Sequence, residues 1–133
     1  MESAPRIPAA VAAARVRWTA RALQVLVVVF LLSDAVSHVV MPAPVTEAFQ
    51  RLGLAVALGP GLGILMVVFL VVYALPRTAV FGALLLTGYL GGATAINLRA
   101  GSPPFETIFP ILIGVLVWTP LALTDARAKE LLR

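Results

Sequence analysis

Hydrophobic residues are grouped along this chain in long blocks that short polar segments separate. Four blocks are almost free of charged side chains, and each approaches the roughly 20 residues that a helix needs to cross a bilayer core of about 30 Å. None shows the two-residue alternation of a barrel strand. We therefore expect an all-α membrane protein, a bundle of four transmembrane helices with spans at about 21–41, 54–75, 77–98 and 105–124.

The segments between the blocks contain residues that end or begin helices. Pro42 should stop the first span, and Pro76 with Arg77 leaves only a very short turn between the second and third spans. These two spans are therefore expected to be antiparallel neighbours. A fourth helix that starts near Pro104 would hold Glu106 in its first turn, where the helix dipole favours an anion.

A short amphipathic helix is predicted between the first two spans, from Pro44 to Leu52. Its apolar residues recur at helical spacing, at Val45, Ala48, Phe49 and Leu52. Glu47 and Arg51 are four residues apart on the polar side and are expected to pair. We expect this segment to lie in the outer membrane interface.

The two ends of the chain are polar enough to lie outside the bilayer. Residues 1–20, rich in Ala and Pro, are expected to form a cytoplasmic tail that is loose or lies on the surface. Asp125 is a suitable cap for a short cytoplasmic helix within 125–133. The residues around Asp34 also resemble the end of a cleavable signal peptide, so removal of the first span stays open as an alternative.

Composition excludes several classes of protein. Apolar residues make up 61% of the 133 residues and charged residues 12%, about half of the roughly 25% that is usual in soluble domains. The mean hydropathy of +1.02 argues against a water-soluble enzyme and against disorder. Cysteine is absent and His38 is the only histidine. We therefore expect no disulfide, no metal site and no cofactor held by this chain alone.

The distribution of Lys and Arg predicts the orientation. The net charge is +4, but the basic residues form no patch with interleaved aromatics, so a nucleic-acid partner is not expected. Eight basic residues would lie on the side of both tails: Arg6, Arg15, Arg17, Arg21, Arg77, Arg127, Lys129 and Arg133. Only Arg51 and Arg99 would lie on the other side. Both termini should therefore be cytoplasmic.

Polar side chains inside the spans mark the candidate site. Asp34 costs about 2.5–3.5 kcal/mol inside a membrane helix unless it is paired, protonated or facing water. His38 lies one turn further along the same helix face. Thr94 and Asn97 lie at similar depth in the third span, and with Tyr89 they complete the expected ligand site. We assign no catalytic residue. The alternative is that the Asp–His pair only fixes the register of two helices.

Small residues give the third span a face that a neighbouring backbone could approach. Gly88 and Gly92 form a small-xxx-small pair, which predicts tight packing within the bundle. The alternative is that these glycines make room for a flat ligand beside Tyr89. Glycines around Pro60 predict an irregular start of the second span.

Three segments together resemble the DoxX-like family of small bacterial membrane proteins with four helices. They begin with "FLLSDAVSHVV", "LGILMVVFLVVYALPRTAVFG" and "IFPILIGVLVWTP". The resemblance covers about residues 22 to 133, and the run from Pro76 through Gly101 is its most specific part. It implies a four-helix bundle in the bacterial inner membrane. Some relatives are associated with sulfur oxidation that feeds quinone, or with oxidative-stress complexes.

The resemblance extends to individual positions. Asp34 matches an acidic position that part of the family carries, and His38 stands where relatives have Lys or His. Met66 stands where many relatives have Glu. Asn97 stands where many have His before the Leu-Arg pair, here Leu98 and Arg99. The bundle interior has thus lost an acid and an imidazole.

Three functions follow as hypotheses, and the sequence does not decide whether the protein is an enzyme. The first is an accessory or quinone-linked subunit of a membrane redox system, with quinone as a ligand and a soluble or membrane partner that supplies electrons. The second is a structural or assembly partner of another membrane protein. The third is a small transporter, which would require a homo-oligomer because the spans contain few polar residues.

Overall fold

The computed structural model describes residues 8–133, which fold into helices with no strand among them. The elements in chain order are α1 (Ala9–Val40), α2 (Ala43–Arg51), the 3-10 turn η1 (Val56–Leu58), α3 (Gly59–Ala74), α4 (Ala79–Arg99), α5 (Pro104–Thr124) and α6 (Ala126–Leu131). Four helices are long and apolar enough to cross a membrane: α1, α3 together with η1, α4 and α5. The predicted all-α membrane bundle is confirmed.

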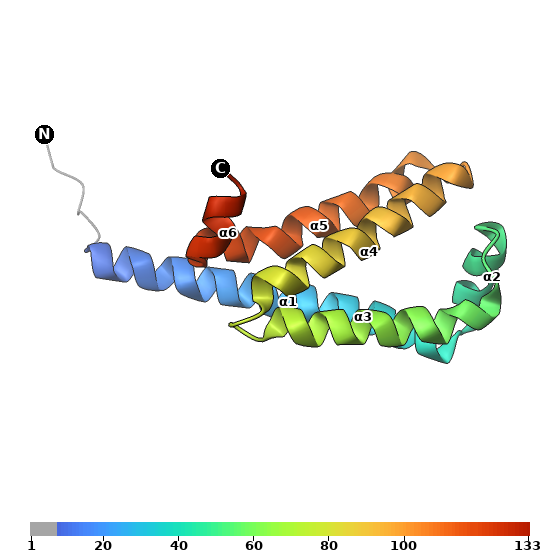
Figure 1. The fold of residues 1–133 in the computed structure, drawn as a ribbon, viewed down its shortest axis with the longest axis horizontal. Helices are drawn as coiled ribbons and strands as arrows, with labels where there is room; N and C mark the ends of the chain where they lie inside the picture. The colour runs from blue at the N-terminus through green and yellow to red at the C-terminus, as the bar shows by residue number, and fades with distance from the viewer. Residues whose placement is uncertain (1–7) are drawn as a thin grey trace, which may run out of the picture.

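The four long helices form a ring in the order α1, α3, α4, α5, because α1 and α4 each pack against both α3 and α5. The pair α1 and α3 lies along one side of the molecule and the pair α4 and α5 along the other (Figure 1). The two pairs meet near the turn between α3 and α4 and diverge toward the end that carries α2. We call the end at the turn between α3 and α4 the closed end, and the end that carries α2 the open end.

Tyr73 holds the closed end together, because it contacts the three other long helices. Its side chain is fully buried, and its hydroxyl donates a hydrogen bond of 2.8 Å to the carbonyl of Val117 in α5. Its own carbonyl accepts a hydrogen bond of 3.3 Å from Gln24 in α1. Gly82 of α4 packs directly on its backbone, where a Cβ would collide. The sequence analysis did not single out this residue.

The small residues of α4 are used differently from the prediction. The close helix contacts are at Gly82, against Tyr73, and at Gly63 of α3, where a Cβ would lie 2.5 Å from the carbonyl oxygen of Ala35. By contrast, a Cβ at Gly88 or Gly92 would meet nothing within 4 Å. The expected tight packing through the Gly88–Gly92 pair is therefore wrong, since the helices cross nearer the closed end.

The outer faces of the long helices are apolar, as a lipid environment requires. Large hydrophobic side chains are exposed on all four, among them Val25, Leu26, Ile64, Val71, Phe81, Leu84, Ile111 and Val115. Among residues 8–133 no Asp, Glu, Lys or Arg is buried. The chain thus presents mainly hydrocarbon to its surroundings, and apart from Asp34 in α1 its charged residues lie toward the two ends of the bundle.

Helix α1 begins well before the expected start of its span. It runs from Ala9, so residues 9–20 are helical rather than loose. Their alanines have the highest helix propensity of any residue, and this outweighs their lack of packing. At about 1.5 Å per residue the 32-residue helix is about 48 Å long, which exceeds the bilayer core. The first part of the expected tail, residues 1–7, lies outside the described residues.

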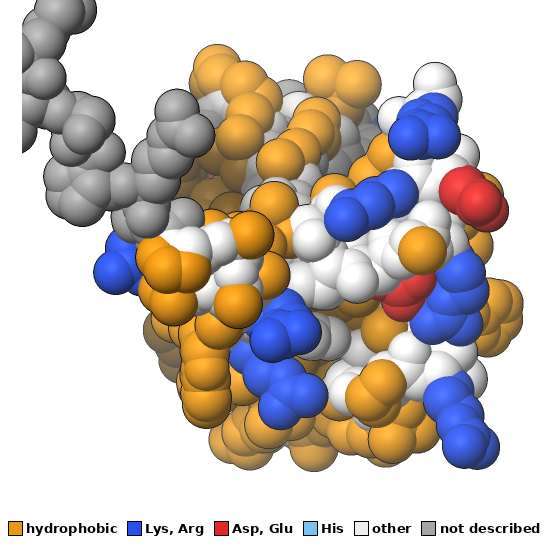
Figure 2. Space-filling model, turned by 90° about the vertical axis from the view of Figure 1, so that its left-hand side faces the viewer, with side chains coloured by type: hydrophobic (Ala, Val, Ile, Leu, Met, Phe, Trp, Pro, Cys, Tyr) orange, Lys and Arg blue, Asp and Glu red, His pale blue; other side chains and the backbone are white. Residues whose placement is uncertain are grey.

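The other expected irregularities are present. The η1 turn precedes α3 and gives the second span the predicted irregular start. Asp125 caps α6, because its carboxylate accepts a hydrogen bond of 2.9 Å from the backbone of Arg127. Figure 2 looks onto the closed end and shows Lys and Arg side chains distributed over it.

Candidate functional site

A cavity of about 510 Å³ occupies the open half of the bundle. It lies between the diverging helix pairs, and α1 to α5 all contribute to its walls. Most of the lining is apolar. The polar side chains on it are those of Asp34, His38, Tyr89, Asn97 and Glu106. Four of the five residues expected to form the ligand site therefore share one cavity.

The His38 imidazole is oriented by its own helix. Its Nδ1 lies 2.8 Å from the backbone carbonyl oxygen of Asp34. Because a carbonyl oxygen only accepts, Nδ1 must carry the proton. The carboxylate of Asp34 is 3.7 Å from the same nitrogen, so it acts on the ring as a nearby charge. Nε2 makes no hydrogen bond within the described chain and is left for a ligand.

The side chains of His38 and Asp34 differ in how far they are buried. The His38 side chain is 19% exposed and that of Asp34 is 47% exposed. The imidazole is thus enclosed by the walls, whereas the carboxylate is open to the cavity. A carboxylate that faces a cavity rather than lipid avoids most of the cost of burying a charge in hydrocarbon.

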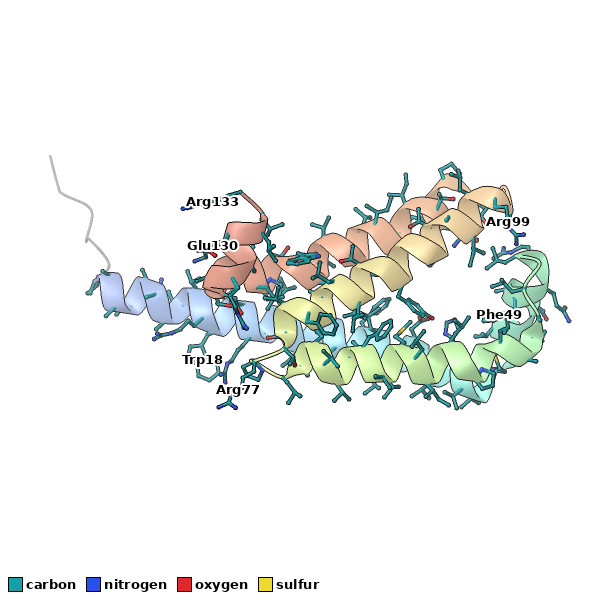
Figure 3. All side chains as sticks on the ribbon, viewed as in Figure 1. Trp18, Phe49, Arg77, Arg99, Glu130 and Arg133 are labelled. Carbon is teal, nitrogen blue, oxygen red and sulfur yellow. The ribbon has the colours of Figure 1, made fainter. Side chains whose placement is uncertain are left out.

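Helix α2 covers the open end of the cavity. Its buried residue Phe49 packs edge-on against His38, with ring centroids 5.4 Å apart. Arg99 at the end of α4 donates a hydrogen bond of 2.9 Å to the carbonyl of Leu52. Figure 3 labels Phe49 and Arg99, which both lie at this end. The apolar face of α2 is therefore turned toward the bundle.

The polar side of α2 is paired differently from the prediction. Arg51 forms an ion pair of 3.0 Å with Glu106 of α5, and the expected pair with Glu47 is wrong. An exposed ion pair of this kind contributes little to stability, about 0–1 kcal/mol. Its effect is positional, because it connects α2 to the helix on the far side of the opening.

Helix α4 turns one face to the cavity and another to α5. Tyr89, Asn97, Gly88 and Gly92 line the cavity. The Asn97 amide donates to the carbonyl of Ala93 at 3.0 Å, and its oxygen accepts no hydrogen bond from residues 8–133.

Thr94 lies on the other face, in a groove between α4 and α5, and its hydroxyl donates to the carbonyl of Leu90. It is therefore separated from the four other expected site residues, because it lies five residues after Tyr89, which is about 140° around the helix axis.

Aromatic rings that the sequence analysis did not select form much of the cavity wall. Phe109 contacts Phe30 with ring centroids 5.9 Å apart and Phe105 at 5.5 Å. Phe69 packs edge-on against Tyr89 at 6.5 Å. Four of the six phenylalanines line the cavity. Their position in the same half of the membrane spans as Asp34 is the feature of the sequence that could have indicated them as cavity residues.

The cavity has the properties of a site for a lipophilic molecule. Its volume and its few polar groups among apolar walls are typical of small-molecule pockets. Within residues 8–133, no group of three or more His, Cys, Asp or Glu side chains is placed to hold a metal ion. The lining offers hydrogen-bonding groups at Tyr89 and Asn97 and ionisable side chains at Asp34 and His38.

Four apolar helices arranged around an internal cavity define an α-helical, multi-pass membrane protein. The chain belongs to the DoxX-like family, whose family model matches residues 22–119. No curated protein and no solved structure shows significant similarity to the chain.

Proposed function

We propose that the cavity binds a quinone or a similar flat, lipophilic molecule, and that the protein is an accessory, quinone-linked subunit of a redox system in the bacterial inner membrane. The observation that carries this proposal is the position of His38, with Nε2 free, on the wall of a largely apolar cavity of about 510 Å³ that includes four phenylalanine rings. The sequence has no cysteine and a single histidine, so a soluble or membrane partner would supply the electrons.

The state of His38 suits both forms of such a ligand. With Nδ1 holding the proton toward the Asp34 carbonyl, a neutral ring presents Nε2 as an acceptor for a quinol hydroxyl. A protonated ring presents an N–H donor to a quinone carbonyl. The Asp34 carboxylate lies 3.7 Å from Nδ1, so the contacts with Asp34 leave Nε2 available to either form of the ligand.

The open glycines supply room for the ring of the ligand. A Cβ at Gly88 or Gly92 would meet nothing within 4 Å, and both positions flank Tyr89 on the cavity wall. A flat molecule placed over this face of α4 would contact Tyr89, and Asn97 lines the same cavity wall.

Equilibrium dialysis of the purified protein in nanodiscs against a short-tailed ubiquinone analogue tests the proposal. His38→Ala should weaken binding by about tenfold, because it removes one hydrogen bond of about 1–1.5 kcal/mol. Ser37→Ala is the matched control, since this neighbour bonds only to the Ser33 carbonyl. Gly88→Val should fill the cavity and weaken binding, whereas Gly91→Val, which faces the other groove, should not.

Equal affinities for His38→Ala and Ser37→Ala, or an absence of saturable binding, would refute the ligand site. The redox role is tested separately with membranes that contain the protein. Asp34→Asn should lower their quinone-dependent reductase activity, and unchanged activity would refute the redox role even where binding is observed.

A second candidate is an assembly partner of another membrane protein. Its support is the groove of about 530 Å³ between α4 and α5, which includes Gly91 and Gly114. Small residues of this kind allow a foreign helix to approach closely. Co-purification in mild detergent tests this role: Gly91→Val should abolish capture of a defined membrane partner, and Gly88→Val should preserve it.

We also propose that both termini are cytoplasmic, since the tails and the turn at Arg77 carry most of the Lys and Arg. Fusions of alkaline phosphatase and of a fluorescent protein to each terminus test this. Phosphatase activity at either terminus would contradict the topology.

A further inference from the structure

A second cleft, of about 360 Å³, lies at the closed end of the bundle, away from the ligand cavity. One wall is a single face of α1, formed by Arg17, Arg21 and Gln24, whose spacing of four and three residues aligns them. The other walls come from the turn between α3 and α4 and from the junction of α5 with α6.

The junction wall is held in place by Arg127. Its guanidinium donates to the carbonyl of Arg77 at 2.9 Å and to that of Pro76 at 3.1 Å. It also contacts the Asp125 carboxylate at 2.8 Å and 3.2 Å. Four hydrogen bonds thus engage the Arg127 guanidinium, and they hold α6 against the turn between α3 and α4.

The charge in the cleft is positive. Asp125 is its only acidic residue among those described, and the hydrogen bonds from Arg127 hold the pKa of that carboxyl below its ordinary value. Its charge is matched by Arg127. Arg17 and Arg21 form no ion pair and no hydrogen bond with any residue in 8–133. Two guanidinium groups thus face the cleft without a counter-ion from the described chain.

The surroundings of the cleft favour a lipid over a soluble anion. Trp18, one residue from Arg17, is 74% exposed, which is typical of a side chain at a membrane interface. Further along α1, Val25 and Val29 are exposed on the side that adjoins the Arg17–Gln24 face, the same side as Trp18. A molecule with its anionic group between the arginines could therefore place its acyl chains on this adjoining apolar surface.

We propose that this cleft binds the phosphodiester headgroup of an anionic phospholipid, with Arg17 and Arg21 as its charged ligands and Gln24 at the base of the site. Guanidinium groups match phosphate oxygens in geometry as well as in charge. The proposal stands apart from the ligand cavity, because no residue lines both sites.

Native mass spectrometry of the full-length protein in detergent, titrated with phosphatidylglycerol, tests the proposal. The double variant Arg17→Gln, Arg21→Gln should bind this lipid about thirtyfold more weakly, as expected for the loss of two arginines near an anionic headgroup. The matched control is Arg15→Gln, Arg133→Gln, which removes the same charge from residues outside the cleft. It should retain the affinity of the original protein.

Three outcomes decide the matter. Preferential binding of phosphatidylglycerol over phosphatidylcholine, lost only in the cleft variant, supports the site. Equal losses in the two double variants would overturn it, because the attraction would then come from overall charge. Competition by millimolar inorganic phosphate, with no preference between the two lipids, would also overturn it and would indicate a soluble anion instead.

Discussion

Adding a single methyl group at Gly82 gives the most direct test of how the bundle is closed. A Cβ there would collide with the backbone nitrogen and Cα of Tyr73 and lie 2.8 Å from its Cβ. Ordinary contacts between carbons are about 3.5–4.0 Å. Because backbone atoms cannot rotate away as a side chain does, Gly82→Ala should push α4 from α3 by about 1 Å.

The magnitude follows from comparison with Gly91→Ala. Both changes replace a glycine in α4, so the gain in helix propensity of about 1 kcal/mol is common to both and cancels. A Cβ at Gly91 meets nothing within 4 Å. The difference in unfolding free energy should therefore equal the overpacking cost at Gly82, about 1–3 kcal/mol.

The assay is reversible unfolding in mixed micelles of dodecylmaltoside and sodium dodecyl sulfate, followed by far-ultraviolet circular dichroism. Gly82→Ala should unfold at a lower mole fraction of sodium dodecyl sulfate than Gly91→Ala. Unfolding free energies of the two variants that agree within about 0.5 kcal/mol, the usual range for substitutions without a structural effect, would contradict the close contact between Gly82 and Tyr73.

Two further predictions concern the closed end. Tyr73→Phe removes the hydrogen bond to Val117 but keeps the ring, so the unfolding free energy should fall by about 0.5–1.5 kcal/mol in the same assay; no change would mean that the hydroxyl is not bonded. Hydrogen bonds from Arg127 lower the pKa of Asp125 in the folded protein below its ordinary value of 3.8. The stability that the ionised Asp125 adds to α6 is therefore fully present above pH 3.8 and is lost as the pH falls through the lower folded-state pKa. Amide hydrogen exchange in α6 should therefore accelerate below about pH 4 relative to the rest of the chain, and Asp125→Asn should accelerate it at neutral pH. Equal exchange in Asp125→Asn and the original protein would contradict this role.

Hydropathy alone was sufficient to place the four long helices. Each is an apolar block bounded by Pro, Gly or charge, and the structure ends the helices within a few residues of the expected limits. The exception is the start of α1 at Ala9. Residues 9–20 are not apolar enough to indicate a span, and helix propensity rather than hydropathy determines their conformation.

The candidate site was less predictable, because the sequence gives the depth of a residue in the membrane but not the neighbour that its helix face contacts. The rise per residue places Asp34, Asn97 and Thr94 at similar depth. Which face of α4 looks into the cavity depends on the order of the helices around the ring, and two mirror-related orders fit the same hydropathy pattern. Thr94 lies in the other groove for this reason.

The contacts of the glycines in α4 also depend on how the four long helices are arranged around the bundle. Gly82, Gly88 and Gly92 are equivalent in sequence, but only Gly82 lies where two helices cross. Crossing points are set by all the side chains of both helices, so no local pattern identifies them. The aromatic wall around Phe109 was missed because phenylalanine is also an ordinary lipid-facing residue.

Joined at Tyr73 and separated at α2, the helix pairs give the molecule the outline of a wedge (Figure 1). Such a solid displaces more lipid from one leaflet than from the other, and the energy of the surrounding membrane then depends on its curvature. We expect the protein to concentrate where curvature stretches the leaflet that holds the broad half, independently of any ligand.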